Sequence, residues 1–271
     1  MARENKVQIK GLVRFSYLSK NGFAISDKGQ EAVRDILYAP DRLDRRFALF
    51  ERLALRSIVN QRDEHFKVGI LIGDDFPEAA RQRLEGMVAD VPQAQIVSLP
   101  QMIHYTAIKR AFAAMADEPE ATHTATFRLD DDDAIHRLTT RRVRQLATSL
   151  LAIRDRKVPF ALAFNRGFYL EVGNRQKPIS EWYEKTPLGV GLALVAPKEA
   201  TVNVFRRNHR KLGEYFDCFT EIERPMFIRS VHPDNDSAAE PTGRKGTLDE
   251  DGILRVLRRG FGLSLDELRN V

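Results

Sequence analysis

The chain has 271 residues, of which 43% are hydrophobic and 30% charged, so it can bury one large core or two small ones. Its 43 basic and 38 acidic residues give a net charge of +5, a mild basic bias that permits an anionic substrate without selecting one. A single cysteine, Cys218, excludes an internal disulfide and a cysteine-based zinc site. No basic tail or RNA-binding signature is present, so nucleic acid is not an expected partner.

Membrane-spanning segments are not expected. The longest apolar run, residues 188–196, is far shorter than the roughly 20 residues that cross a bilayer. The amino terminus also lacks the apolar core of a signal peptide. We therefore expect a cytoplasmic protein, and the basic bias is compatible with peripheral association at the inner face of the plasma membrane.

The first half of the chain alternates between strand and helix patterns. Residues 7–17 predict an opening strand, and a helix follows with an apolar stripe made of Leu43, Phe47, Phe50, Ala54 and Ile58. Residues 66–72 predict a short buried strand, and Pro77 suits the first turn of the next helix. A strand at 96–99 and a helix at 107–115 complete the alternation.

The second half is richer in strand patterns. Thr139 is expected to cap a helix that reaches Ile153. Strands are then expected at 160–164, 168–172, 189–195 and 225–231, with helices at 202–215 and 249–259 and a mobile loop at 237–246. The whole pattern predicts an α/β fold whose mixed sheet is flanked by helices, with the second-half strands added antiparallel to the first half's sheet.

The most informative stretch is the run of four aspartates from Asp130 to Asp133, which follows an extended segment at 124–129. Two unit charges about 6 Å apart repel by roughly 3 kcal/mol at an effective dielectric near 20. At the end of a buried strand such a run needs a divalent cation, an arginine or a proton. Side chains alternate along a strand, so Asp130 pairs with Asp132, and Asp131 with Asp133. Carboxylates suit Mg²⁺ or Mn²⁺ with positions left open for phosphate oxygens.

Three stretches carry a family resemblance: residues 14–18, residues 46–61, and residues 127–134 with the aspartate run. They are similar to the bacterial family of putative rhamnosyl transferases, and the order of elements resembles the GT-A class of nucleotide-sugar glycosyltransferases. The resemblance extends from about residue 10 to about residue 235. It implies a single GT-A-like, Rossmann-like domain over 1–271, with a nucleotide-sugar-binding half at 1–135 and an acceptor-binding half at 136–271.

The resemblance also implies roles for the acidic cluster. Asp132 would be the main ligand of a Mn²⁺ or Mg²⁺ cofactor, and Asp130 would contact the ribose or donor sugar and help to hold the ion. Asp133 would be a catalytic residue that orients hydroxyl groups. His232, which follows a predicted strand, would be the third metal ligand, although its neighbours also predict a simple turn. His209 is the alternative ligand.

Basic and polar residues are the candidates for binding the donor. Arg14 and Ser16 lie on the opening strand, where the resemblance places the nucleoside. Arg244 and Lys245 lie in the predicted loop and are expected to close over the diphosphate. Arg128 is expected to neutralise a neighbouring carboxylate.

The acceptor side offers several candidate bases. Asp217 is the preferred one, and spacing does not separate it from three others in the second half, Glu171, Glu181 and Glu221. Trp182 and Tyr183 would either stack on an acceptor sugar or pack in the core.

Together these features predict a metal-dependent glycosyltransferase that moves a sugar, rhamnose by the family's label, from a nucleotide-diphosphate donor to a glycan or lipid-linked hydroxyl acceptor. A metal-dependent nucleotidyltransferase is an alternative, although residues 19–22 make a poor version of its glycine-rich loop. A non-catalytic module that binds divalent cations is the other. The sequence does not choose between inversion and retention.

Overall fold

The structure is a computed structural model that describes residues 6–20, 29–233, 235 and 240–270. Seven strands form the larger sheet: β1 (Val7–Arg14), β2 (Lys67–Gly73), β3 (Ala94–Leu99), β4 (His123–Asp130), β6 (Phe160–Phe164), β9 (Ala193–Pro197) and β10 (Asp217–Glu221). Five strands form the smaller sheet: β5 (Ala134–Ile135), β7 (Arg166–Glu171), β8 (Ile179–Tyr183), β11 (Phe227–Val231) and β12 (Arg244–Lys245).

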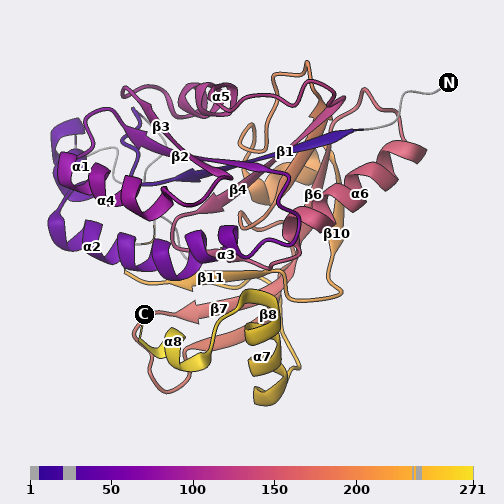
Figure 1. Ribbon diagram of the computed structural model, residues 1–271. Helices are drawn as coiled ribbons and strands as arrows, with labels where there is room; N and C mark the ends of the chain where they lie inside the picture. The colour runs from indigo at the N-terminus through magenta and orange to yellow at the C-terminus, as the bar shows by residue number, and fades with distance from the viewer. Residues whose placement is uncertain (1–5, 21–28, 234, 236–239, 271) are drawn as a thin grey trace.

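The helical segments lie around these two sheets (Figure 1). The α-helices are α1 (Gln30–Leu37), α2 (Pro40–Leu49), α3 (Arg56–Val59), α4 (Glu78–Val88), α5 (His104–Ala114), α6 (Thr139–Ile153), α7 (Glu250–Val256) and α8 (Leu265–Arg269). The described residues also form two π-helical segments, η2 (Phe50–Leu55) and η4 (Leu257–Phe261), and a 3₁₀ segment, η3 (His209–Glu214). The mixed sheet flanked by helices that the sequence predicts is confirmed.

The order of strands in the larger sheet determines where a ligand can bind. The order is β10-β6-β9-β4-β1-β2-β3, and β1 runs parallel to both β2 and β4. The chain therefore leaves β1 on one side and returns to its other side at β4. Open α/β sheets bind ligands at the carboxyl ends of the strands beside such a reversal. Arg14 and Asp130 are register partners at that end of β1 and β4.

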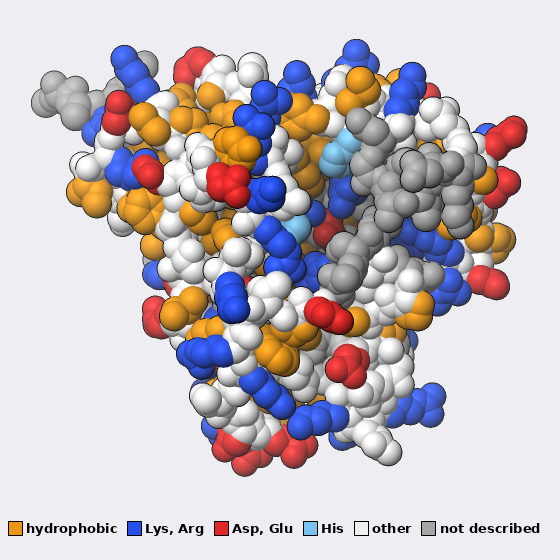
Figure 2. Space-filling view, turned by 180° about the vertical axis from the view of Figure 1, so that it is seen from behind, with side chains coloured by type: hydrophobic (Ala, Val, Ile, Leu, Met, Phe, Trp, Pro, Cys, Tyr) orange, Lys and Arg blue, Asp and Glu red, His pale blue; other side chains and the backbone are white. Residues whose placement is uncertain are grey.

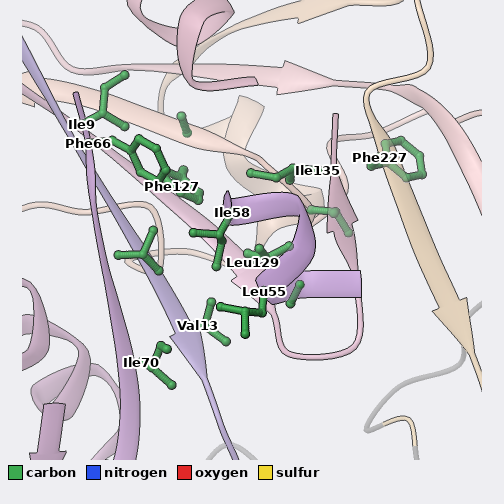
Figure 3. Close-up of a cluster of buried hydrophobic side chains, with 14 of the residues drawn as sticks. Ile9, Val13, Leu55, Ile58, Phe66, Ile70, Phe127, Leu129, Ile135 and Phe227 are labelled. Atoms are coloured by element: carbon green, nitrogen blue, oxygen red, sulfur yellow. The ribbon is translucent and has the colours of Figure 1, made fainter. Parts of the chain in front are cut away.

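Helices cover both faces of the larger sheet. Helix α5 packs against one face, where Leu12, Leu71 and Val97 are buried. Helices α2, α3, α4 and α6 pack against the other face (Figure 1). Figure 3 shows Leu55 and Ile58 of this helical layer beside Leu129 of the sheet. On that face the Phe127 ring lies over Gly11 of the neighbouring strand, and a Cβ atom at Gly11 would approach the ring to 2.2 Å.

The predicted stripe from Leu43 to Ile58 is confirmed as a buried helical face, but a π-helical turn at Phe50–Leu55 interrupts it. A π turn shifts the register of the face that follows it, and such turns occur often at functional sites. Arg46 lies on the same buried face, between Leu43 and Phe47, and only 9% of it is exposed.

The predicted antiparallel addition of second-half strands to the first half's sheet is present, since β9 pairs antiparallel with β4, but the other second-half strands form a second sheet. Strands β6, β9 and β10 join the larger sheet, whereas β7, β8, β11 and β12 belong to the smaller one. The chain crosses between the sheets at Asn165, which is the single residue between β6 and β7. Its backbone N–H donates to the Glu221 carbonyl and its side-chain amide to the Glu184 carbonyl, so both sheets hold the crossing.

Some local predictions also differ from the structure. Thr139 does not cap α6 with its side chain; it is the first helical residue, and its hydroxyl donates instead to the carbonyl of His136 at 2.7 Å. The helix expected at 202–215 shrinks to the 3₁₀ segment η3, whose cap is the Asn208 side chain. Of the predicted mobile loop, residues 237–239 lie outside the described residues, and Arg244 and Lys245 form β12.

Candidate active site

The four aspartates lie at the carboxyl end of β4, in a cavity of about 280 Å³. Residues of β1, α1, α2, β4, η3 and β11 line it together with loop residues: Arg14, Ser16, Tyr17, Leu37, Arg42, Arg46, Arg128, Asp130, Asp131, Asp132, Asp133, Gly189, His209, Arg229 and Asn235. Figure 2 shows a hollow on one face of the molecule with Lys and Arg side chains gathered around it and carboxylates visible inside.

Asp130 lies between two arginines. Arg14 donates to one carboxylate oxygen at 3.1 Å, and Arg128 approaches the other at 3.5 Å. Burial favours the neutral carboxyl, but the charges of Arg128 and Arg14 outweigh it and hold the Asp130 pKa well below its usual value. Asp130 is therefore ionised, and Arg128 neutralises it as the sequence predicts.

Arg46 joins the next two aspartates. Its Nε donates to Asp131 at 3.0 Å and its Nη1 to Asp132 at 2.8 Å, and its Nη2 makes a further contact with Asp131. Burial and the neighbouring Asp132 charge raise the Asp131 pKa to about 6, although Arg46 opposes them. Burial acts on Asp132 as well, but Arg46 and His232 lower its pKa to about 2. The Arg46 guanidinium thus binds both central aspartates of the run, Asp131 and Asp132.

Asp132 also reaches the end of β11. Its Oδ2 lies 2.8 Å from Nε2 of His232 and 3.2 Å from the side-chain nitrogen of Asn235. Asp133 accepts a hydrogen bond at 2.9 Å from the backbone N–H of Ser230. Burial and the Asp132 charge raise the Asp133 pKa, and the nearby Arg229 only partly offsets them. Strand β11, which His232 directly follows, therefore closes one side of the cavity.

The charges in the cavity favour an anionic ligand. Five arginines and four aspartates line it. Burial and the Arg128 charge lower the His209 pKa to about 3, and burial and Arg14 lower that of His104, whose Nε2 is 3.1 Å from Arg14, to about 4. Both imidazoles are therefore neutral near pH 7. A phosphate-bearing ligand would meet a surplus of guanidinium groups.

At two positions that line the cavity, Ser16 and Gly189, the backbone determines the local geometry. Ser16 adopts a φ of 48°, in the left-handed region that residues with a Cβ atom seldom enter, and its hydroxyl accepts from Arg42 at 3.1 Å. A Cβ atom at Gly189 would lie 2.9 Å from the Arg128 guanidinium, so glycine lets this arginine pack against the wall of the cavity.

The residues present fit a divalent cation only in part. Within the described ranges, no three His, Cys, Asp or Glu side chains converge as a ready-made metal cage. Mg²⁺, however, typically takes one or two protein ligands and completes an octahedron with water and substrate phosphates at about 2.1 Å. Adjacent ligands of such an octahedron are about 3 Å apart, close to the 2.8 Å between Asp132 Oδ2 and His232 Nε2. Asp132 and His232 are thus compatible with an ion that a diphosphate helps to hold.

The structure brings most of the predicted site residues together. Arg14, Ser16, Asp130, Asp132 and Asp133 all line the cavity, as does the alternative ligand His209. His232 joins them through Asp132.

Other predicted residues lie elsewhere. Asp217 is the first residue of β10, which runs parallel to β6 and so begins at the sheet end opposite the aspartates; it pairs with Arg154 at 2.6 Å. Asp217 is not among the residues that line the cavity. Arg244 and Lys245 pair with β8 of the smaller sheet. Their assignment to the donor, like that of Asp217 as a base, stays a prediction.

Four residues that line the cavity were not singled out as site residues from the sequence, namely Arg42, Arg46, Arg229 and Asn235, and neither was His104, which contacts Arg14. For Arg46 a signal was available, because a charged residue within an apolar helical stripe needs a buried partner. Arg229 gives the same signal between the apolar residues of β11. His104 and Asn235 do not interrupt an apolar pattern, so the sequence gives no comparable signal for them.

Comparison with known proteins defines the class. A fold that binds its ligand where parallel strands reverse, with acidic and guanidinium groups gathered at that point, is typical of enzymes that act on phosphorylated substrates. The model of the putative rhamnosyl transferase family matches residues 8–244. The chain belongs to this family.

Solved structures resemble the chain at low sequence identity. TarS of S. aureus, residues 1–349 in complex with UDP-GlcNAc, matches with a TM-score of 0.46 at 10% identity, over 84% of this chain and 60% of that one. The same fragment in complex with UDP matches with a TM-score of 0.43 at 12% identity, over 83% of this chain and 61% of that one. The chain thus spans less than two thirds of these neighbours. No curated protein matches the chain.

A search of the described residues for membrane spans found no helix long and apolar enough to cross a bilayer.

Proposed function

We propose that this protein transfers a sugar, rhamnose by the family's name, from a nucleotide-diphosphate donor to a hydroxyl group of a glycan or lipid-linked acceptor. The observation that carries the proposal is the cavity at the ends of β1 and β4, where arginines surround the aspartate run. TarS is recorded with UDP-GlcNAc, which agrees with a nucleotide-sugar donor. A cytoplasmic location with peripheral contact to the inner membrane face belongs to the same proposal.

We assign the donor's diphosphate to the part of the cavity that Arg14 and Arg128 line. When the glycosidic bond to the diphosphate breaks, negative charge grows on the leaving phosphate, and fixed guanidinium groups stabilise that charge. Arg14 and Arg128 are held in place by Asp130, and both pack around the Phe205 ring, with Arg128 at 5.0 Å and Arg14 at 6.0 Å from its centroid. They are therefore positioned before the substrate arrives.

The proposal includes a divalent cation, Mn²⁺ or Mg²⁺, held by Asp132 and His232 with Asp130 nearby. When bound, such an ion supplies positive charge to the leaving diphosphate. Arg46 fixes the Asp132 carboxylate, while Asp133, oriented by the Ser230 N–H, is proposed to orient hydroxyl groups in the reaction.

The decisive experiment measures what the protein releases from a panel of nucleotide sugars with Mn²⁺, with Mg²⁺ and with chelator. A glycosyltransferase releases nucleoside diphosphate and a nucleotidyltransferase releases pyrophosphate. A cation-binding module releases neither. Pyrophosphate as the sole product, or no product from any donor, would contradict the proposal.

The matched variants are Asp132→Asn and Asp155→Asn. Asp132→Asn keeps the side-chain volume but removes the charge that faces the proposed ion, so we expect metal-dependent stabilisation by nucleoside diphosphate to fall at least about tenfold in affinity. Asp155 is exposed in the loop after α6 and should leave that affinity unchanged. Circular dichroism confirms that both variants fold. Wild-type binding by Asp132→Asn, measured as thermal shift with Mn²⁺, would remove the metal from the proposal.

A further inference from the structure

A group of cationic side chains lies next to the cavity, beside His209. Two segments carry it, residues 206–211 and residues 242–245, and its charged members are Arg206, Arg207, Arg210, Lys211, Arg244 and Lys245. We call these two segments the cationic ledge. Within the described residues 206–215 and 240–245, the exposed carboxylates are Glu214 and Glu240. Six cations against two exposed acids make these segments more strongly basic than the chain as a whole, which has 43 basic and 38 acidic residues.

The ledge is continuous with the cavity. His209, inside the first segment, lines the cavity, and Arg128 reaches its Nδ1 at 3.5 Å. Arg210 joins the two segments, since its Nη1 lies 3.4 Å from the Thr242 hydroxyl and 3.6 Å from the buried Glu184 carboxylate. Thr242 in turn donates to Glu184 at 2.6 Å. A buried carboxylate therefore fixes both parts of the ledge beside the site.

Aromatic rings hold the exposed guanidinium groups in place. Arg244 lies 3.7 Å from the centroid of the Tyr183 ring, and Arg207 lies 4.0 Å from that of Tyr215. A guanidinium stacked on a ring keeps its N–H groups at its edge available to a ligand. In the described part of the chain, neither arginine forms an ion pair with a carboxylate, in contrast to Arg210.

We propose that the cationic ledge binds the acceptor, and that the acceptor is an anionic glycan bearing phosphate or carboxylate groups. The inference rests on the proposed sugar transfer, because it assigns the ledge to the second substrate of that reaction. Exposed cations such as Arg207 and Arg244, which form no ion pair with a described carboxylate, favour a ligand that carries negative charge. The ledge also gives Arg244 and Lys245 a different role from the donor contact that the sequence predicts.

The test compares two triple variants that lose the same charge. Arg207→Gln/Arg244→Gln/Lys245→Gln alters the ledge, and Arg255→Gln/Arg258→Gln/Arg259→Gln alters three exposed arginines of the C-terminal helical segment. The probes are fluorescent oligogalacturonate and phosphorylated maltohexaose, which separate carboxylate from phosphate recognition, with neutral maltohexaose as the reference. Fluorescence anisotropy at two salt concentrations measures binding.

We expect the ledge variant to bind at least one anionic probe about tenfold more weakly, with a smaller salt dependence. The C-terminal variant should bind within about twofold of wild type, and the neutral probe should bind weakly to all three proteins. Equal losses in both variants would show that only net charge matters and would overturn the proposal, as would wild-type binding by the ledge variant.

Two further measurements separate this proposal from its rivals. Thermal stabilisation by UDP should be unchanged in the ledge variant; a parallel loss would assign the ledge to the donor instead. The wild type and the ledge variant should co-sediment equally little with vesicles of phosphatidylcholine and phosphatidylglycerol. Co-sedimentation that the ledge variant loses, without binding of the glycan probes, would assign the surface to a membrane. A chain that binds the anionic probes but releases no nucleoside diphosphate would contradict the proposed reaction and leave the ledge's specificity in place.

Discussion

At the scale of single residues, the site is a set of buried charges in which each aspartate has a defined partner. Asp130 has Arg14 and Arg128, Asp131 has Arg46, and Asp132 has Arg46 and His232. Uncompensated charges of one sign at this depth would cost several kcal/mol each. The arginines therefore make the aspartate run compatible with a folded core as well as with an anionic ligand.

The loss of Arg46 tests this directly. Arg46→Gln leaves the buried Asp131 and Asp132 without their shared guanidinium, so the free energy of unfolding at pH 7 should fall by about 3 kcal/mol or more. Arg269→Gln removes an exposed ion pair with Asp266 and should cost below about 1 kcal/mol. Urea denaturation measures both. If Asp132 holds a cation, Mg²⁺ should stabilise the Arg46 variant more than the wild type; equal costs for the two substitutions would contradict the argument.

A buried histidine provides a pH prediction. Burial lowers the His136 pKa to about 4, so the unfolded chain, whose histidine titrates near 6.5, binds more protons between these values. Stability from this group is therefore complete above pH 6.5 and decreases as the pH falls toward 4, by about 2 kcal/mol at pH 5. His136→Leu should lose less stability than the wild type between pH 7 and pH 5 in chemical denaturation. If the free energy of unfolding of both proteins changes equally between pH 7 and pH 5, His136 is not the source of the pH dependence.

At the scale of elements, replacing either of two glycines in helical segments by alanine should change the stability in opposite directions. Gly260 lies in η4, where a Cβ atom would meet the His136 ring at 2.5 Å, whereas Gly86 lies inside α4 with nothing within 4 Å of such an atom. Gly260→Ala should destabilise the protein by about 1–3 kcal/mol through overpacking. Gly86→Ala should stabilise it by about 0.5–1 kcal/mol through helix propensity. Thermal unfolding of both variants checks the pair, and stabilisation by Gly260→Ala would show that η4 does not pack on His136.

At the scale of the whole molecule, the C-terminal segment covers the smaller sheet. Leu257, Phe261 and Leu268 pack in one apolar cluster with Phe168 and Ile228 of β7 and β11. Figure 1 shows α7 and α8 beside that sheet. This segment follows the part of the chain that the family model matches, residues 8–244. It therefore supports β11, the strand that His232 directly follows, although the segment itself lies beyond the residues that the family model matches.

Removal of residues 250–271 should expose that apolar face. We expect dye binding typical of exposed hydrophobic surface, self-association, and fast amide exchange in β7 and β11, since an uncovered patch of this kind promotes aggregation. Size-exclusion chromatography and hydrogen exchange measure these effects. A truncated chain that stays monomeric, with the exchange rates of the full chain in both strands, would contradict this role.

The sequence by itself determined the alternation of strands and helices, the buried stripe from Leu43 to Ile58 and the acidic end of β4, because side-chain periodicity and strand ends are local properties. It also pointed to Arg14, Ser16 and His232 through a resemblance carried by short motifs.

Only the tertiary structure decided which groups meet. Asp132 and His232 are 100 residues apart in sequence, Arg46 and Asp131 are 85 apart, and parallel pairing of β1 with β4 places Arg14 beside Asp130 across 116 residues. The crossing at Asn165 and the direction of β10, which takes Asp217 to the far end of the sheet, depend on long-range strand pairing. Periodicity specifies which face of a strand is buried, but not which sheet it joins or which neighbour it takes.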